Sequence, residues 1–236
     1  MTKLGDRLHL NREQAYENLE KMLLPEIVKG DNEDHVEMKI IVDVLKVMYN
    51  SSRWEDRYGA INGTILLVKF WYATKEPNMV DFVWNHVRVN MLPILILDSE
   101  FRVRNQLGLL LREMIAADPQ KGAWHFDKLK DMLLDNIEAT FTREPLGGVD
   151  ASADVALIKG TNKVINRDET GKTMHDTEGW KSLETSMRIL QNIIESIGNS
   201  LYNFDLSRVL NVIKKGVDHI NRFVREISYF VINAIF

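Results

Sequence analysis

One segment of the sequence has residue types that could bind a phosphate. Gly171-Lys172-Thr173 is the end of a phosphate-loop motif, in which backbone N–H groups and a lysine surround the phosphates of a nucleotide. The complete motif needs a glycine five residues before Gly171 and a buried strand ahead of the loop. Asn166 stands at the glycine position, and no strand-like run leads into the segment. The pattern therefore indicates a chance match and no nucleotide site.

Histidine, cysteine and carboxylate groups are the next candidates for chemistry. The chain has six histidines and no cysteine, which excludes disulfides, thiolate metal sites and cysteine nucleophiles. No His-x-x-x-His pair occurs, and the carboxylates at 168–178 do not follow the calcium-loop pattern. The nucleophile and dinucleotide-binding motifs of common enzyme folds are also missing. We therefore expect no enzyme activity, no catalytic residue, no metal and no cofactor.

Aromatic and basic side chains remain, and they favour binding over catalysis. Phe70-Trp71-Tyr72 places rings on successive faces of a helix, so that one ring is a candidate hot spot for a partner. Basic residues cluster modestly at 102–112 and at 214–225, where they could contact an acidic partner or satisfy carbonyl groups at helix C-termini. The candidates for partner contact are Arg57, Trp71, Arg102, Lys214, Lys215 and Arg222.

Composition favours a folded protein that binds other proteins. Of the 236 residues, 45% are hydrophobic and 27% are charged, as in globular proteins, and the net charge is −4. Nucleic-acid binders usually carry a basic excess that neutralises phosphates, so the expected partner is a protein and not a nucleic acid. The N-terminus has no apolar signal segment, and no apolar run is long enough for a membrane helix. We expect a soluble cytoplasmic protein with no membrane insertion.

Apolar residues recur every three to four positions along most of the chain, which predicts helices. Proline is scarce, and this also favours long helices over short strands. The predicted helices cover about 11–29, 31–48, 52–74, 77–95, 99–117 and 124–141, followed by three that contain 183–194, 206–213 and 223–231. We expect the buried faces to contain Val36, Ile40, Val44, Val47 and Met48 in the second helix and Val103, Leu107, Leu110 and Met114 in the fifth.

Three local features refine these helices. Asn11 is the expected N-cap of the first helix, with Gln14 in the capping-box position three residues later. Gly59 and Gly63 lie four residues apart within a predicted helix, which would weaken it unless a neighbouring helix packs closely there. Pro93 lies inside another predicted helix and is expected to kink it.

The helical period is lost between about Thr142 and Glu178. This stretch is rich in glycine, aspartate, lysine and threonine, with no long apolar pattern. Such long structureless segments are uncommon in compact domains, so 142–178 is expected to be a functional loop or a flexible insertion. It could be a partner-binding segment that orders on contact. The rest of 1–236 is expected to form a single helical domain.

Two segments of the chain match each other. Residues 91–114 and 209–232 each contain an apolar helix, an aspartate, a short polar turn and a Val-Arg or similar pair that opens a second helix. Asp98 precedes Arg104 by six residues, and Asp218 precedes Arg225 by seven. In a weaker copy, Arg57 takes the arginine place and Asn50 or Ser51 the aspartate place. Internal similarity of this kind is typical of repeat proteins.

A further weak copy lies at 182–194, where Glu184 replaces the arginine. The distance from Arg57 to Arg104 is 104 − 57 = 47 residues, which lies within the roughly 40–47 residues of HEAT and armadillo repeats. From Arg104 to Arg225 the distance is 225 − 104 = 121 residues, or about three units of 40.

The Leu92-Pro93 pair, Asp98 and Val103-Arg104, followed by an apolar helix, resemble a HEAT repeat. The resemblance covers about 24 residues well and a second 24 nearly as well. It implies an all-α fold, an α–α superhelix of about eight to ten helices in antiparallel pairs. It also implies a structural ladder in which aspartates and arginines join adjacent repeats, formed here by Asp98, Arg104, Asp218 and Arg225. At Glu184 the chain departs from this pattern, so a break in the ladder is expected there.

A superhelix of this kind presents a long groove that holds extended partners through many modest contacts. We therefore expect a non-catalytic scaffold or adaptor that binds a protein partner. The alternatives are a helical-repeat protein that binds nucleic acid or processes its bases, and a transport or chaperone-type factor that binds clients. The last helix is apolar up to Phe236, whereas repeat arrays normally end in a polar capping helix. We expect further repeats, a covering partner or self-association at that end.

Overall fold

The computed structural model describes residues 3–27, 36–74, 82–118, 122–142 and 180–236. Helices account for nearly all of these residues, and no strand occurs among them. The all-α fold class is confirmed for this part of the chain. The elements are α1 (His9–Ile27), α2 (Val36–Tyr49), α3 (Trp54–Thr74), η1 (His86–Met91), α5 (Leu92–Leu95), α6 (Phe101–Ala117), α7 (Gly122–Thr142), α10 (Trp180–Ile197), η2 (Gly198–Asn203), α11 (Ser207–Val217) and α12 (Arg222–Ile235).

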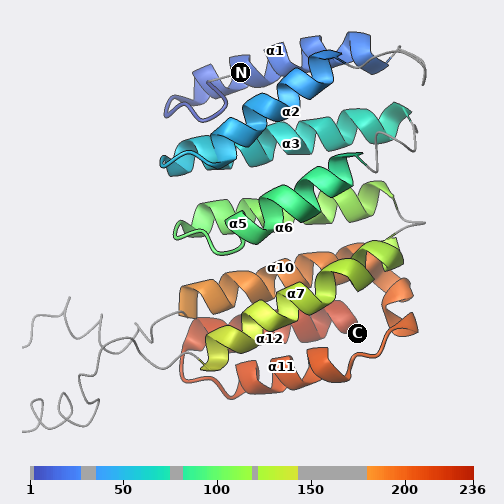
Figure 1. Cartoon of the computed structure of the whole chain (residues 1–236). Coiled ribbons are helices and arrows are strands. Elements are labelled where there is room, and N and C mark those ends of the chain that lie inside the picture. The colour runs from blue at the N-terminus through green and yellow to red at the C-terminus, as the bar shows by residue number, and fades with distance from the viewer. Residues whose placement is uncertain (1–2, 28–35, 75–81, 119–121, 143–179) are drawn as a thin grey trace, which may run out of the picture.

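The helices form two layers, which Figure 1 shows stacked from α1 at one end to α11 and α12 at the other. One layer, the stacking layer, consists of α1, α3, α6, α10 and α12, each packed against the next. Across it lie α2, α5, α7 and α11, which pack on α3, α6, α10 and α12 respectively. Each helix pair has apolar residues on more than one side, so its burial depends on the neighbouring pairs.

The core follows the stacking layer. In α6 the predicted face of Val103, Leu107, Leu110 and Met114 is completely buried, and this prediction is confirmed. The corresponding face of α10, which includes Leu183, Met187, Leu190 and Ile194, is also buried. In both helices these apolar residues recur every three to four positions. The helical period of 3.6 residues therefore places them on one face, which packs into the core.

The predicted face of α2 is partly wrong. Ile40 is 53% exposed and Val47 is 74% exposed, whereas Ile41 and Leu45 are completely buried. The apolar residues of α2 lie on several sides of the helix, so that two different apolar faces could pack against a neighbour. Contact with α3 selects one of them, because Leu45 packs where Gly63 leaves room.

Close packing is confirmed at both glycines of α3. A methyl group at Gly59 would lie 2.5 Å from the backbone carbon of Leu4, so the chain ahead of α1 crosses directly over α3. At Gly63 it would lie 2.7 Å from a terminal methyl of Leu45 in α2. The neighbour at Gly59 is therefore a non-helical segment and not the helix that was expected.

The expected N-cap at Asn11 is wrong. Helix α1 begins at His9, so Asn11 lies in its first turn. The turn is instead formed by Asp6, whose Oδ1 accepts the backbone N–H of Leu8 at 2.8 Å. An aspartate two residues ahead of an N–H group makes such a turn readily.

The kink expected at Pro93 takes the form of a π-helical turn. Residues 82–85 are helical and continue into η1, where the N–H of Leu92 donates to the carbonyl of Val87, five residues earlier. A proline ring clashes with the carbonyl four residues before it, here that of Val89. Widening the preceding turn relieves this clash while the helix continues into α5.

Residues 143–179 lie outside the described part of the chain, so the predicted insertion at 142–178 is described only at Thr142, the last residue of α7. None of the helices in the described ranges combines the length and the apolar character needed to cross a bilayer.

Candidate functional site

Four helices of the stacking layer begin in the same way, with an arginine at their fourth residue. Its side chain points back toward the helix start, as long helical side chains do, and Nη1 donates to the carbonyl six residues earlier. We call this arrangement the arginine corner. It occurs at Arg12 with the carbonyl of Asp6 (2.7 Å), at Arg57 with that of Ser51 (2.9 Å), at Arg104 with that of Asp98, and at Arg225 with that of His219 (2.8 Å).

The residue six positions before each arginine also accepts a hydrogen bond from the backbone two residues later. The acceptors are Asp6 Oδ1 (2.8 Å), Ser51 Oγ (3.2 Å), Asp98 Oδ1 (2.9 Å) and His219 Nδ1 (3.0 Å). The aspartate place is therefore taken by Ser51 in one weaker copy, and by His219 in the last copy. Asp218, assigned to this place from the sequence, is instead the exposed C-cap residue that follows α11.

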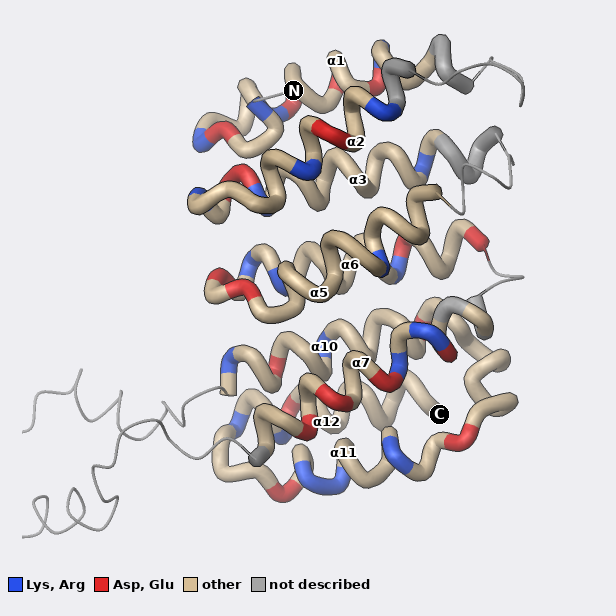
Figure 2. The backbone as a smooth tube through the Cα atoms, viewed as in Figure 1, with Lys and Arg blue, Asp and Glu red and all other residues tan. Residues whose placement is uncertain are grey.

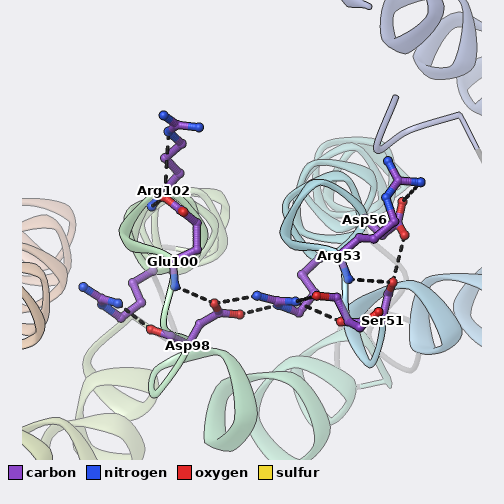
Figure 3. Close-up of polar contacts among 9 residues, drawn as sticks. Ser51, Arg53, Asp56, Asp98, Glu100 and Arg102 are labelled. Carbon is purple, nitrogen blue, oxygen red and sulfur yellow. Dashed lines mark hydrogen bonds and ion pairs between the residues drawn. The ribbon is translucent and has the colours of Figure 1, made fainter. Parts of the chain in front are cut away.

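Arg57 and Asp98 join the second corner to the third (Figure 3). Arg57 Nε lies 2.5 Å from Asp98 Oδ2 and Nη2 lies 2.8 Å from Oδ1, with side-chain exposures of 14% and 4%. The Asp98 carboxylate raises the pKa of Arg57, because it stabilises the charged form. The Asp98 carboxylate thus binds Arg57 of the preceding helix α3. The backbone carbonyl of Asp98 accepts a hydrogen bond from Arg104 of α6.

Arg104 continues the chain of contacts to α10. Its Nε donates to Thr185 Oγ1 at 2.8 Å and its Nη2 to the carbonyl of Lys181 at 3.2 Å. The residue is only 3% exposed, and burial lowers the pKa of its guanidinium. Arg57, Asp98 and Arg104 are thus brought together, whereas the hydrogen bonds of Arg225 stay within its own corner.

The candidates for partner contact do not form one cluster. Arg102 lies over the Trp54 ring at 4.9 Å and is 54% exposed at its side chain. Lys214 and Lys215 are exposed in the last turn of α11, and Arg222 is exposed at the start of α12. The side chain of Trp71 lies outside the described residues. Figure 2 shows positions of lysine and arginine in many helices along the stack, interspersed with positions of aspartate and glutamate.

A groove of about 690 Å³ runs between α6 and α10. Three aromatic rings lie at one end of it, where α6, α10 and α12 begin. Amide side chains, charged side chains and Leu109 make up the rest of the lining. The rings are Phe101, Trp180 and Phe223, and the amides are Asn105, Gln191 and Asn192.

Both arginines of the groove are paired with glutamates. Arg112 lies 3.5 Å from Glu195, and Arg188 Nη2 lies 2.5 Å from Glu184 Oε1. Lys181 lies over the Trp180 ring at 5.6 Å, where the ring attracts its ammonium group. The groove therefore has little charge to attract a strongly ionic ligand.

Two buried polar atoms of the groove have no hydrogen-bond partner within the described residues. They are Asn105 Oδ1, an acceptor, and Trp180 Nε1, a donor. Buried polar groups are usually paired, so an unpaired acceptor and donor in one groove require an explanation. Both residues line the groove, so a ligand held there could supply the missing partners.

A second groove, of about 460 Å³, lies between α1 and α3. Burial raises the pKa of Tyr16, which lines it, to about 12. Three α3 residues of this groove and three α6 residues of the first groove stand one, five and eight positions after the corner arginine. They are Tyr58, Asn62 and Ile65 in α3 and Asn105, Leu109 and Arg112 in α6.

Sequence reasoning missed the first corner and both grooves. The signal for the corner was present, because Asp6 precedes Arg12 by six residues, the interval between Asp98 and Arg104. The distance from Arg12 to Arg57 is 57 − 12 = 45 residues, close to the 47 that separate Arg57 from Arg104. The grooves gave no comparable signal, because they depend on how neighbouring helices pack.

No family model, no curated protein and no solved structure matches this chain. Among the described residues, no group of three histidine, aspartate or glutamate side chains is arranged to hold a metal ion. The contacts between side chains therefore carry the functional argument.

Proposed function

We propose that the chain is a solenoid of HEAT-type helical units and that it acts as a non-catalytic scaffold, holding an extended segment of a partner protein in the α6–α10 groove. The four arginine corners support a repeated unit, because the same hydrogen bonds recur at spacings of 45 and 47 residues between the first three. The stacked layers support the curved, one-dimensional packing of a solenoid.

The observation that carries the proposal is the unpaired acceptor and donor at Asn105 and Trp180. An extended peptide presents N–H and C=O groups along its backbone and so matches this combination. The rings at one end of the groove provide stacking surfaces of the kind found in binding hot spots. The volume also lies within the range of about 300–1,000 Å³ typical of ligand sites.

The balance of charge in the groove favours a peptide over a nucleic acid. Its arginines are paired with glutamates, whereas phosphate binding needs unpaired basic groups. The nucleic-acid alternative predicts binding that weakens steeply with salt and disappears after nuclease treatment. A client-binding transport or chaperone role would use the same groove, and identification of the partner separates it from a scaffold.

Site-specific photo-cross-linking tests the groove directly. A photoreactive benzoylphenylalanine replaces Leu109, which lines the groove, or Val47, which is 74% exposed on α2. We expect position 109, and not position 47, to capture a discrete protein that mass spectrometry identifies together with the cross-linked peptide. Equal capture at both positions, or capture only of nucleic acid, would contradict the proposal.

Asn105→Ala then tests the unpaired acceptor with the identified partner segment. Removing an unpaired buried atom should leave the free energy of unfolding unchanged within about 0.5 kcal/mol. The same change should weaken binding about fivefold, since one hydrogen bond contributes about 1 kcal/mol. Unchanged affinity would show that Asn105 does not contact the partner.

A further inference from the structure

Two corner arginines use opposite sides of their guanidinium groups for different contacts. In Arg57 and Arg104, Nη1 donates to the carbonyls of the residue's own loop. The Nε and Nη2 groups reach the next unit of the stack. For Arg57 they bind the Asp98 carboxylate, and for Arg104 they bind Thr185 Oγ1 and the carbonyl of Lys181.

The corner arginine is the first residue of a row, spaced by three or four positions, on the helix face that packs on the next helix pair. We call this row the stripe. In α6 this stripe consists of Arg104, Gly108, Leu111 and Ile115, and all four are buried. Gly108 lies directly under α10, because a methyl group there would be 3.1 Å from Ile189. In α3 the stripe contains Arg57 and Thr64, whose hydroxyl lies 3.6 Å from Met91 Sδ.

Helix α12 has the same stripe, but much of it is uncovered. Its members are Arg225, Tyr229, Ile232 and Phe236, and Tyr229 and Phe236 are 55% and 90% exposed. Arg225 Nη1 holds the carbonyls of His219 and Ile220 at 2.8 and 2.7 Å. Its Nε and Nη2 make no hydrogen bond or ion pair with the described residues, so the side that would reach a next unit is open.

The opposite end of the stack offers the matching groups. Asp6 stands at the place of Asp98, and no basic side chain of the described residues forms an ion pair with it. The Leu8 N–H, followed by Asn11, lowers the pKa of Asp6, so its carboxylate is ionised at neutral pH. Leu10 stands at the place of Arg102, which covers Trp54 of the preceding unit, and is 69% exposed.

We propose that copies of this chain associate head to tail, with the α12 stripe of one copy packed on the α1 end of the next. Arg225 then pairs with the partner's Asp6 as Arg57 pairs with Asp98 within the chain. Exposed apolar side chains lie near each charge in the sequence, Tyr229 and Phe236 near Arg225 and Leu8 and Leu10 near Asp6, and the two charges have opposite sign. Since the two surfaces differ, the contact is heterologous and can add further copies.

Two variants that each block one surface test this arrangement. Tyr229→Glu blocks the α12 stripe and Leu10→Glu blocks the α1 end, and both positions are exposed, so both variants should fold. In sedimentation velocity and light scattering, we expect the mass of the wild-type chain to rise with concentration. Each variant alone should be monomeric, and an equimolar mixture should form a dimer and nothing larger, because one surface of each kind remains.

Three results would overturn the proposal. They are a wild-type chain that stays monomeric at every concentration, a Leu10→Glu variant that still dimerises, and a mixture that stays monomeric. Dimerisation of Leu10→Glu would identify a symmetric contact between two α12 helices instead.

A third variant tests the ion pair itself. Asp6→Asn keeps the acceptor for the Leu8 N–H and removes the charge, and it should weaken association about tenfold. Asp205→Asn is the matched control, because Asp205 accepts the N–H of Ser207 at 2.9 Å in the same way and lies outside both surfaces. Equal effects of the two substitutions would exclude the Arg225–Asp6 pair.

Discussion

Arg57 and Asp98 stand 41 residues apart in the sequence and meet through two hydrogen bonds, Nε to Oδ2 at 2.5 Å and Nη2 to Oδ1 at 2.8 Å. The Asp98 side chain is almost completely buried, at 4% exposure, and the Arg57 side chain is mostly buried, at 14%. Further hydrogen bonds hold both partners in place, from Arg57 Nη1 to the carbonyl of Ser51 and from the N–H of Glu100 to Asp98 Oδ1. The pair therefore fixes the position of α6 relative to α3.

Removing either partner of this pair should be costly. Arg57→Ala leaves the Asp98 carboxylate buried without its counter-charge, and the free energy of unfolding should fall by about 3–5 kcal/mol. The double variant with Asp98→Ala should show a coupling energy of about 1–3 kcal/mol in denaturant unfolding. Arg53→Ala is the control, because Arg53 is 54% exposed and lies 3.8 Å from Asp56, so its loss should cost less than about 1 kcal/mol. Additive effects of the two buried substitutions would disprove the coupling.

Arg104 should not tolerate replacement by lysine. Its guanidinium reaches three acceptors in different directions, on Asp98, Lys181 and Thr185, and a single ammonium group cannot span them. We expect Arg104→Lys to lower the free energy of unfolding by about 2–3 kcal/mol, because buried acceptors lose their donors. Arg102→Lys at the exposed neighbouring position should change it by about 0.5 kcal/mol or less. Equal stability of the two variants in urea unfolding would contradict the reasoning.

Sequence patterns predicted the helices and the buried side of α6 because one face of that helix is uniformly apolar. They failed at α2, where two apolar stripes compete and the contact with Gly63 decides between them. The aspartate of the last corner was misplaced by one residue, because a histidine can accept the same backbone hydrogen bond. The pairing of Asp98 with Arg57 was also missed, since spacing alone does not show which side of a guanidinium faces the next unit.

The groove could not be predicted from the sequence either. Its lining comes from α6, α10 and the start of α12, which are separated by long stretches of chain. The individual residues, such as Asn105 and Gln191, have the composition of an ordinary solvated helix face. Only the packing of the two helices makes them neighbours.

The two close-packed glycines of α3 should respond differently to alanine. At Gly59 the new methyl group would meet backbone atoms of Leu4 at 2.5 Å, so Gly59→Ala should lower the free energy of unfolding by about 1–3 kcal/mol. At Gly63 it would meet the end of the Leu45 side chain, which can rotate away. Alanine also favours the helix over glycine by about 1 kcal/mol, which offsets the cost of moving Leu45. The free energy of unfolding of Gly63→Ala should therefore be nearly unchanged. Thermal unfolding measures both, and a more stable Gly59→Ala would refute the predicted close crossing.

Stability should fall as the pH drops below neutrality, partly because of His86. Burial, followed by the charge of Lys46, lowers the pKa of His86 below its usual 6.5, although Asp43 opposes this. The unfolded chain then binds a proton near pH 6.5 that the folded chain does not, so stability is lost as the pH falls from 6.5 toward the folded pKa. The pKa of His219 is also lowered, mainly by burial, and acts in the same direction.

His86→Phe separates this contribution from the others. The substitution keeps a ring against Tyr49, whose centroid lies 5.7 Å from that of His86, and removes the titrating group. Between about pH 7.5 and about pH 5.5, the melting temperature of the variant should fall less than that of the wild-type chain. Identical pH profiles would show that His86 does not titrate differently on unfolding.

Each arginine corner closes a loop of only five or six residues, and this has a consequence for the order of folding. Such short loops close quickly, since little chain entropy is lost, whereas the Arg57–Asp98 contact must close a loop of 41 residues. The four corners can therefore form independently, before any helix stacks on another. Substitutions that remove the hydrogen bonds from Nη1 to the loop carbonyls should slow folding. Substitutions that remove only the contact between neighbouring helix pairs, such as Arg57 with Asp98, should mainly speed unfolding.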